Sequence, residues 1–411
     1  MSFLVGLNTG RDTMISHGLA LSAVSDNIAN VNTVSFKTNR PEFADIIAES
    51  IGGLYSTPGM APGNGAQVTM LARMNHQGTI EVTNREYDFA IDGNGYFVTQ
   101  AQDGTIYYTR AGNFSVDSEG YLVTLEGAKV LGYAPGGNTL QSLIVKGLVV
   151  QPRATENVKV TGTLNASSAI TTLPAQPVSY QDLAATASFQ SFGQIYDSQG
   201  QIRDVSFYYF KTADFTWEVQ AYVDGKDLGG TPNQPVLLGS TTLNFPLGSS
   251  GNTIAFGTTW GNGATSHVTV DFSGFFTFSE PSNVSSITAD GFAGGTVESI
   301  RVSDTGVIWG YLNTGVATVI GEFALTTFEN PDSLQRIGNN RYIMGYDTVI
   351  ASVGRPGSEG RGQLKGQMLE LSNVDMAGQF IDLIRFQRGY QAGSKIVQTL
   401  SDLIHTTLNI L

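Results

Sequence analysis

Residues 376–411 read MAGQFIDLIRFQRGYQAGSKIVQTLSDLIHTTLNIL, and this stretch decides the fold because its apolar residues recur at every seventh position. That spacing is typical of an amphipathic helix whose apolar seam packs against another helix. Asn373 and Asp375 come just before, and such side chains accept the unpaired N–H bonds of a first helical turn. We therefore predict a long C-terminal helix with a seam formed by Met376, Leu383, Tyr390, Val397, Ile404 and Leu411.

A second seam of the same period lies at the other end of the chain, at Leu7, Met14, Leu21 and Ile28. An amphipathic helix cannot bury its apolar face alone, so each terminal helix needs a partner. Two pairings are open: with the other end of the same chain, or with copies in other chains. Glycines inside both helices cost about 1 kcal/mol each, which favours helices that become ordered only on assembly. These glycines are Gly10, Gly18, Gly378, Gly389 and Gly393.

The middle of the chain is predicted to be rich in β-strands. Asp103-Gly104 lies between the apolar runs 96–99 and 106–109, which is a strong hairpin signal. From Phe215 to Val223, apolar residues alternate with others, as in a strand with one buried face.

These patterns predict an α+β fold that is mostly β. We expect four parts: a core domain of paired, coiled-coil-like helices, irregular extended linkers rich in proline and glycine, an inner β-domain and an inserted outer β-domain. Both β-domains are expected to be sandwich- or barrel-like. The expected boundaries are 1–31 with 371–411 for the core, 32–72 with 354–370 for the linkers, 73–146 with 313–353 for the inner β-domain and 147–312 for the outer one.

Composition excludes several classes of function. The 411 residues include 22 basic and 35 acidic ones, a net charge of −13, so neither a nucleic-acid surface nor a basic membrane helix is supported. Cysteine is absent, which removes disulfides, thiolate catalysis and cysteine-ligated metals. The sequence contains no G-x-S-x-G, Walker or H-E-x-x-H motif. We therefore expect a chain that is not an enzyme, with no catalytic residue, no metal site and no cofactor.

Targeting signals of the usual kind are also missing. Residues 1–6 lack a basic n-region, so we expect no cleavable secretory signal. No segment approaches a membrane span, which needs about 18 consecutive apolar residues. Composition alone would place the chain in the cytoplasm, if a signal peptide were the only way out of the cell.

Short motifs at both ends carry a family resemblance. Ser25-Asp-Asn-Ile-Ala-Asn30 with Thr33 and Phe36-Lys37 resembles the N-I-A-N-x-x-T-x-G-F-K signature of bacterial flagellar axial proteins, which comprise rod, hook and junction proteins. Ser35 stands where that signature usually has glycine. Near the other end, 371–375 resembles the S-N-V-D element and 387–391 the Q-R-x-Y-Q element. The matching residues are Asn27, Ile28, Ala29, Asn30, Thr33, Phe36, Lys37, Ser372, Asn373, Val374, Asp375, Gln387, Arg388, Tyr390 and Gln391.

Within that family, the hook members carry an inserted middle domain, and the insertion at residues 147–312 resembles theirs in length. The resemblance implies a structural subunit that self-assembles into a flexible tubular helical polymer, a universal joint that transmits motor torque from rod to filament. It implies an extracellular location in the flagellum and export, without a cleaved signal peptide, through the flagellar type III apparatus. The implied partners are copies of the chain and the rod, hook-cap and hook–filament junction proteins, with no nucleic acid and no membrane insertion.

On this interpretation, the seams of the terminal helices are expected to form the buried contacts of an inner tube. The residues concerned are Leu7, Met14, Leu21, Ile28, Leu383, Tyr390, Val397, Ile404 and Leu411. A distal rod or junction protein is the alternative, and a secreted β-rich adhesin or polysaccharide-active protein is a remote one.

Overall fold

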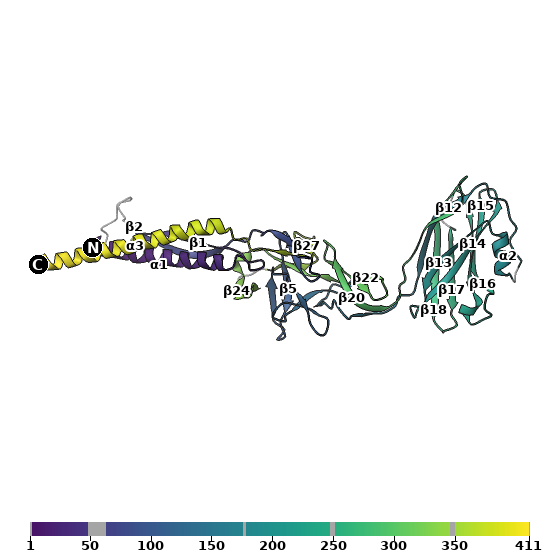
Figure 1. Cartoon of the computed structure of the whole chain (residues 1–411), viewed down its shortest axis with the longest axis horizontal. Helices are drawn as coiled ribbons and strands as arrows, with labels where there is room; N and C mark the ends of the chain where they lie inside the picture. Colours follow the sequence, from purple (N-terminus) through teal and green to yellow (C-terminus); the bar gives the residue numbers. More distant parts are fainter. Residues whose placement is uncertain (1, 48–62, 176–177, 247–250, 346–349, 411) are drawn as a thin grey trace. The chain divides into compact units, whose positions relative to one another are not determined.

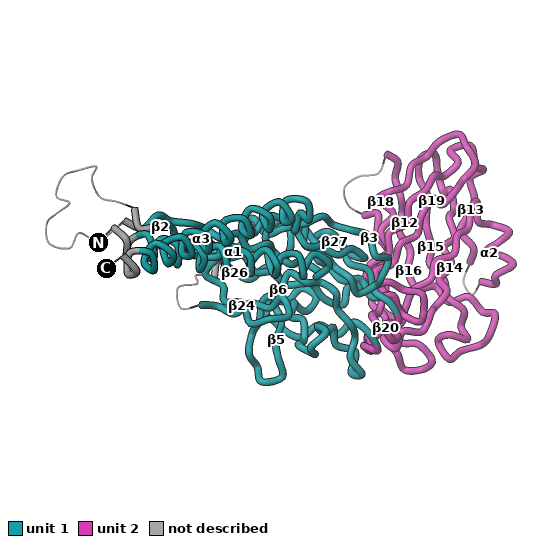
Figure 2. Tube along the Cα trace, turned by 60° about the vertical axis from the view of Figure 1, so that its left-hand side comes forward, with its two compact units in different colours: residues 1–146, 299–310, 318–411 teal, residues 147–298, 311–317 magenta. Residues whose placement is uncertain are grey.

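A computed structural model describes residues 2–47, 63–175, 178–246, 251–345 and 350–410 of the chain. The chain divides into two compact units (Figure 2). Unit 1 consists of residues 1–146, 299–310 and 318–411, and unit 2 of residues 147–298 and 311–317.

The two ends of the chain form long helices in unit 1 (Figure 1). Helix α1 spans Ser2–Ala29 and helix α3 spans Met376–Ile410. They pack side by side and antiparallel, around a small buried cluster of Ala20, Val24 and Phe386. Leu21, Ile28 and Leu383 of the predicted seams pack against that cluster. The expected mostly-β fold with paired terminal helices is therefore confirmed.

The glycines of these helices have a packing role that the sequence did not reveal. A Cβ atom on Gly10 would lie 2.7 Å from Cγ2 of Val397, and one on Gly393 would lie 3.1 Å from the carbonyl oxygen of Gly10. Gly10 and Gly393 are both buried, so the two helix backbones approach each other closely at this level. At Gly18, by contrast, the nearest atom is Cε2 of Tyr390 at 3.9 Å, an ordinary contact distance.

Residues 39–47 and 63–73 correct the expectation of an irregular linker. Strands β1 (Asn39–Ile47) and β2 (Gly63–Arg73) form an antiparallel pair that packs on α1, where the Ser16 hydroxyl donates to the Ala66 carbonyl at 2.8 Å. Pro41 suggested a break, but a strand with a free edge tolerates a residue that lacks an N–H donor. The second expected linker, residues 354–370, also contains paired strands.

Among the other strands of unit 1 lies an aromatic cluster made by Tyr96, Tyr108, Phe328 and Tyr342 with smaller apolar residues. The predicted hairpin at Asp103-Gly104 is confirmed, and it joins β5 to β6. Part of the main antiparallel sheet follows the order β22 (Ala317–Phe323), β9 (Lys129–Tyr133), β5 (Tyr96–Gln100), β6 (Ile106–Thr109), β25 (Arg341–Ile343) and β24 (Gln335–Gly338).

Shorter strands complete this part of the chain. Two pairs link the C-terminal segment to the inner strands: β27 (Gln363–Gly366) with β4 (Phe89–Asp92), and β28 (Met368–Glu370) with β3 (Ile80–Val82). The remaining short elements are β7 (Ser115–Val116), β8 (Leu122–Val123), β10 (Leu140–Ser142), β21 (Val307–Leu312), β23 (Leu325–Phe328), β26 (Ile350–Gly354) and the 3-10 turn η2 (Pro331–Ser333).

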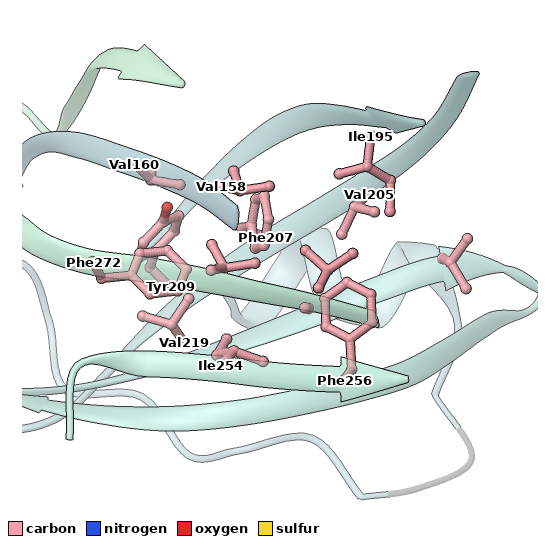
Figure 3. Close-up of a cluster of buried hydrophobic side chains, with 14 of the residues drawn as sticks. Val158, Val160, Ile195, Val205, Phe207, Tyr209, Val219, Ile254, Phe256 and Phe272 are labelled. Carbon is pink, nitrogen blue, oxygen red and sulfur yellow. The ribbon is translucent and has the colours of Figure 1, made fainter. Parts of the chain in front are cut away.

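Unit 2 is a β-sandwich with its core between two sheets (Figure 3). One sheet has the order β17 (Thr253–Thr259), β18 (Thr265–Phe278), β12 (Asn157–Asn165) and β19 (Asn283–Ala289), with β12 and β18 parallel. The other has the order β13 (Phe189–Tyr196), β14 (Ile202–Ala213), β15 (Thr216–Asp224) and β16 (Pro235–Asn244). Further elements are β11 (Val149–Val150), the first half of β20 (Gly295–Val302), the 3-10 turn η1 (Gly225–Leu228) and helix α2 (Tyr180–Thr186).

The strand predicted from Phe215 to Val223 is confirmed in part. Trp217, Val219, Ala221 and Val223 point into the sandwich core, as the alternation predicts. Phe215 does not: it is exposed, in a left-handed turn conformation with φ of 60°.

The opposite face of the same strand is not solvent-exposed throughout, because α2 covers part of it. Ser179 caps α2. Leu183 of that helix packs with Tyr208, Phe210 and Tyr222 in a second buried cluster. Residues of this sheet are therefore buried on both faces where the helix lies.

A buried ion pair closes one end of the sandwich. The Asp197 side chain is fully buried and accepts from Arg203 Nη2 at 3.0 Å, while Arg203 Nη1 reaches Asp227 at 3.2 Å. Asp197 Oδ1 also accepts from the backbone N–H groups of Gln199 and Gln201, each at 2.9 Å. Burial alone would raise the pKa of Asp197, but these donors outweigh it and hold the pKa below its ordinary value.

We expect replacement of Gly10 by leucine to push α1 and α3 apart, because the new side chain meets Val397 at once. Gly18→Ala should do the reverse and stabilise the hairpin by about 1 kcal/mol, since alanine favours the helix and meets no close atom. Amide hydrogen exchange in α1 and α3 of the full chain measures both effects. Equal or greater protection in Gly10→Leu would contradict the close approach.

We expect Asp197→Ala to destabilise the sandwich by about 3–5 kcal/mol, because Arg203 keeps only its pair with Asp227 and the backbone N–H groups of Gln199 and Gln201 lose their acceptor. Trp217 and Trp260 lie in this core, so denaturant unfolding followed by tryptophan fluorescence reports on it. Glu280→Ala, at an exposed position of the same unit, is the control and should shift stability by less than about 0.5 kcal/mol. Similar unfolding of the two variants would show that the pair adds nothing.

Candidate assembly site at the chain termini

The segment that follows α1 attaches the helices to the strands of unit 1. Ser35 adopts a left-handed conformation with φ of 56°, which explains why glycine is usual in the signature at this position. Here the serine makes two contacts that hold the turn. Its N–H donates to the Glu370 carbonyl at 2.8 Å, and its hydroxyl donates to the Arg110 carbonyl at 2.9 Å.

Below this turn lies a buried cluster of three charged side chains, Lys37, Arg110 and Glu370. Glu370 Oε1 accepts from Lys37 Nζ at 2.5 Å, and Glu370 Oε2 accepts from Arg110 Nε at 3.0 Å. The exposed fractions of the three side chains are 3%, 8% and 1%, so water does not screen these charges. The cluster joins the N-terminal segment, the strands of unit 1 and the C-terminal segment.

Backbone groups satisfy the remaining donors and acceptors of the cluster. Lys37 Nζ donates to the His76 carbonyl at 2.9 Å, and the Gly78 N–H donates to Glu370 Oε1 at 2.9 Å. The Arg110 guanidinium also donates to the carbonyl oxygens of Gly95 at 3.1 Å and Gly93 at 2.9 Å. Burial alone would raise the pKa of Glu370, but Arg110 and Lys37 outweigh it and lower that pKa.

Asn27 on α1 and Asn373 just before α3 hydrogen-bond to residues at one end of the β1–β2 pair. Asn27 on α1 accepts from the Asn39 N–H at 2.9 Å and donates to the Asn39 carbonyl at 2.8 Å. It also donates to Gln379 on α3 at 2.9 Å. Asn373 accepts from the Thr38 N–H at 2.8 Å and donates to the Met74 carbonyl at 2.8 Å.

Asp375 caps α3 as expected, accepting from the N–H groups of Ala377 at 3.1 Å and Gly378 at 3.2 Å. Asn373, expected to contribute to the same cap, is instead used by the contacts to Thr38 and Met74.

The other motif residues have varied environments. Phe36 is buried, with the Arg336 guanidinium 5.2 Å above its ring, and Thr33 donates to Asn30 Oδ1 at 3.0 Å. Half-buried residues are Ile28, Asn30, Ser372 and Val374, and exposed ones are Ala29, Gln387, Arg388, Tyr390 and Gln391.

The predicted seam is only partly buried in a single chain. Tyr390 and Ile404 are 45% and 36% exposed, and Leu411 lies outside the described residues. The remaining seam residues are half-buried: Leu7, Met14, Leu21, Ile28, Leu383 and Val397. The role of the seam in an inner tube stays a prediction.

Sequence reasoning missed a second set of apolar side chains, which lie off the heptad lines and are exposed. On α1, Ile15 and Leu19 are 61% and 44% exposed. On α3, Phe380, Ile381 and Ile384 are 50%, 67% and 56% exposed. The sequence did contain a signal for this second set. A helix that pairs with a single partner has one apolar stripe, whereas these helices carry apolar residues on more than one face.

Within the described ranges, no group of three or more histidines, aspartates or glutamates is placed to hold a metal ion. No helix in that part of the chain is long and apolar enough to cross a membrane.

Four family models match the chain in order. Residues 7–37 match the flagella basal body rod protein model, and residues 90–166 match the flagellar hook protein FlgE/F/G D1 domain. Residues 163–292 match the flagellar basal body protein FlaE D2 domain, and residues 365–410 the flagellar basal body rod FlgEFG protein C-terminal model.

Curated relatives match over nearly their whole length. The flagellar hook protein FlgE of Rhizobium meliloti is 29% identical over 100% of both chains. That of Salmonella typhimurium is 29% identical over 95% of this chain and 96% of its own, and that of Borreliella burgdorferi is 27% identical over 98% and 99%. The chain belongs to the flagellar hook protein family.

The motif resemblance is thereby confirmed for this hook-family chain, and the rod or junction alternative is not favoured. The crystal structure of Helicobacter pylori flagellar hook protein FlgE2 covers 71% of this chain and 100% of its own. Its 17% identity and TM-score of 0.49 add nothing to the assignment.

We expect Glu370→Gln to destabilise unit 1 by about 3–5 kcal/mol, because Lys37 and Arg110 are left as buried cations without an anion. Thermal unfolding and hydrogen exchange in β4 and β5 measure the loss. Glu42→Gln removes the exposed pair with Arg40 and serves as the control, with an expected change below about 0.5 kcal/mol. If both variants unfold alike, the buried cluster does not hold this unit together.

Proposed function

We propose that this chain is the structural subunit of a bacterial flagellar hook and polymerises through its terminal helices into a tubular helical assembly. Membership in the hook family supports the structural role. The observation that carries the proposal is the exposed apolar surface that α1 and α3 keep after they have packed against each other. Such a surface on a soluble chain is typical of an interface.

Two different apolar patches make the contact between copies. The α1 patch, Ile15 and Leu19, packs against the α3 patch, Phe380, Ile381 and Ile384, of the next copy. A contact between two unlike patches is heterologous, and it repeats without closing when the rotation between copies does not complete a ring. This is the geometry that a helical polymer needs. The half-buried seam residues complete the burial within the inner tube.

The buried cluster of Lys37, Arg110 and Glu370 gives the polymer its mechanical continuity. It connects the helices, which form the inner layer, to the strands of unit 1. A junction held by several charge-assisted hydrogen bonds passes a twisting load from one layer to the next without sliding.

The outer layer is proposed to be the part that slides when the tube bends. The outer β-domain is predicted at residues 147–312; most of that range falls in unit 2, residues 147–298 and 311–317, whereas residues 299–310 belong to unit 1. Charged residues make up only 14% of the chain, so few ion pairs between copies would fix one register.

The location, partners and export route of the chain are proposed from its resemblance to the family. The chain works in the bacterial flagellum as a non-catalytic component, without a cofactor or metal. Its partners are copies of itself and the neighbouring rod, cap and hook–filament junction proteins. It leaves the cell through the flagellar type III apparatus without a cleaved signal peptide.

We expect Ile381→Glu with Ile384→Glu to abolish polymerisation while the monomer stays folded, because two charges enter the apolar contact between copies. Negative-stain electron microscopy of the concentrated full-length chain, seeded with sheared tubes, should show elongated tubes of uniform width for the unchanged protein and none for the double variant. Leu125→Glu, in a turn at 74% exposure, is the matched control and should still elongate the seeds. Tubes formed equally well by the double variant would exclude this face as the interface.

A further inference from the structure

His17 lies where three elements of unit 1 meet. Its ring is on α1, and its neighbours are Phe43 on β1, with ring centroids 5.6 Å apart, and Phe386 on α3, with centroids 6.0 Å apart. Phe43 and Phe386 also contact each other, with centroids 5.8 Å apart. The imidazole is therefore the third ring of a cluster that joins α1, α3 and β1.

The imidazole also fills the space that Gly389 leaves on α3. A Cβ atom on Gly389 would lie 2.5 Å from both Cε1 and Nε2 of His17, so the ring lies directly against the α3 backbone. Nδ1 of His17 is buried and has no hydrogen-bond partner. A proton on that nitrogen would find no acceptor, and an N–H group buried without one is costly.

The charges around this cluster do not compensate a protonated imidazole. On α3, Arg385 disfavours the charged imidazole; this cation pairs with Asp382 at 3.0 Å and lies 4.8 Å from the Phe386 ring centre. Arg388, next to Gly389, is also a cation and is exposed. On β1, Glu42 next to Phe43 is paired with Arg40, and Asp45 is exposed.

The neighbouring segments are uncharged. On α1, the residues one turn before and after His17 are Thr13, Met14, Ala20 and Leu21, and the adjacent part of β2, residues 66–70, contains no charged residue.

We propose that His17 is a proton-sensitive latch, whose neutral ring holds α1 against α3 and β1 and whose protonation loosens the helix hairpin. The latch belongs to the single chain and goes beyond the proposed function, because it acts whether or not copies assemble.

The sign of the pH dependence follows from the environment. Burial lowers the pKa of His17 from its ordinary value of 6.5, and Arg385 lowers it further. The unfolded hairpin therefore takes up the proton more readily than the folded one. The stabilisation is complete above the unfolded pKa of about 6.5 and is lost as the pH falls below it, towards the folded pKa.

The test uses the dilute, unpolymerised full-length chain. NMR titration of the imidazole protons gives the pKa of His17, which we expect below 6.5. Hydrogen-exchange protection of the α1 amides, corrected for intrinsic rates, should fall between pH 7.5 and pH 5 by about tenfold for each unit by which the pKa is lowered. A His17 pKa at or above the ordinary value would overturn the latch.

Two variants separate the latch from a merely structural role. His17→Phe keeps a ring against Phe43 and Phe386 but cannot be charged, so its α1 protection should not change over this pH range. Arg385→Gln leaves His17 in place and removes the neighbouring cation, so the pKa of His17 should rise and the loss of protection in acid should shrink. The second variant decides the matter if the first does not fold.

His405→Gln is the matched control, because His405 is an exposed histidine on α3. It should keep the full acid response. An unchanged acid response in His17→Phe, or its disappearance in His405→Gln, would place the titrating group elsewhere.

Discussion

The carboxylate of Glu370, held between Lys37 and Arg110, is the interaction on which the rest of this molecule depends. A buried charge without a partner is strongly unfavourable, so each of these three side chains requires the other two. They belong to the segment after α1, the strands of unit 1 and the segment before α3. This cluster fixes the segment after α1 and the segment before α3 to the strands of unit 1. The end of α1 and the start of α3 are therefore anchored at the same place.

The helix hairpin beyond that anchor has little core of its own. Among the residues that the structure describes, its buried apolar side chains are those of Ala20, Ala23, Val24 and Phe386. The close approach at Gly10 and Gly393 replaces side-chain packing with backbone contact. Such a hairpin leaves much apolar surface uncovered, which is unfavourable for a monomer and useful to a subunit. The asparagine contacts to Asn39 and Met74, at one end of the β1–β2 pair, keep both helices in place while that surface is open to a partner.

Local patterns in the sequence predicted what local physics controls. The heptad spacing predicted both helices, and Asp103-Gly104 predicted the hairpin, because each depends on neighbouring residues alone. Contacts between distant segments left no such trace: nothing near Lys37 in the sequence indicates that Glu370 and Arg110 surround it. Pro41 suggested a break where the structure has a strand, and Phe215 fits the alternation but lies in the turn that precedes β15. The exposed residues of α3 were overlooked because one regular seam accounted for the helix.

The parallel pairing of β12 with β18 has a consequence for how the chain folds. Its ladder joins residues 157–165 to residues 269–278, and β13 to β17 lie between them in the sequence. Folding rates fall when native contacts connect remote parts of a chain, because a large loop must close before any contact forms. The topology of the sandwich therefore slows its folding. For a subunit proposed to pass unfolded through a narrow channel, slow folding lengthens the time during which the chain remains unfolded.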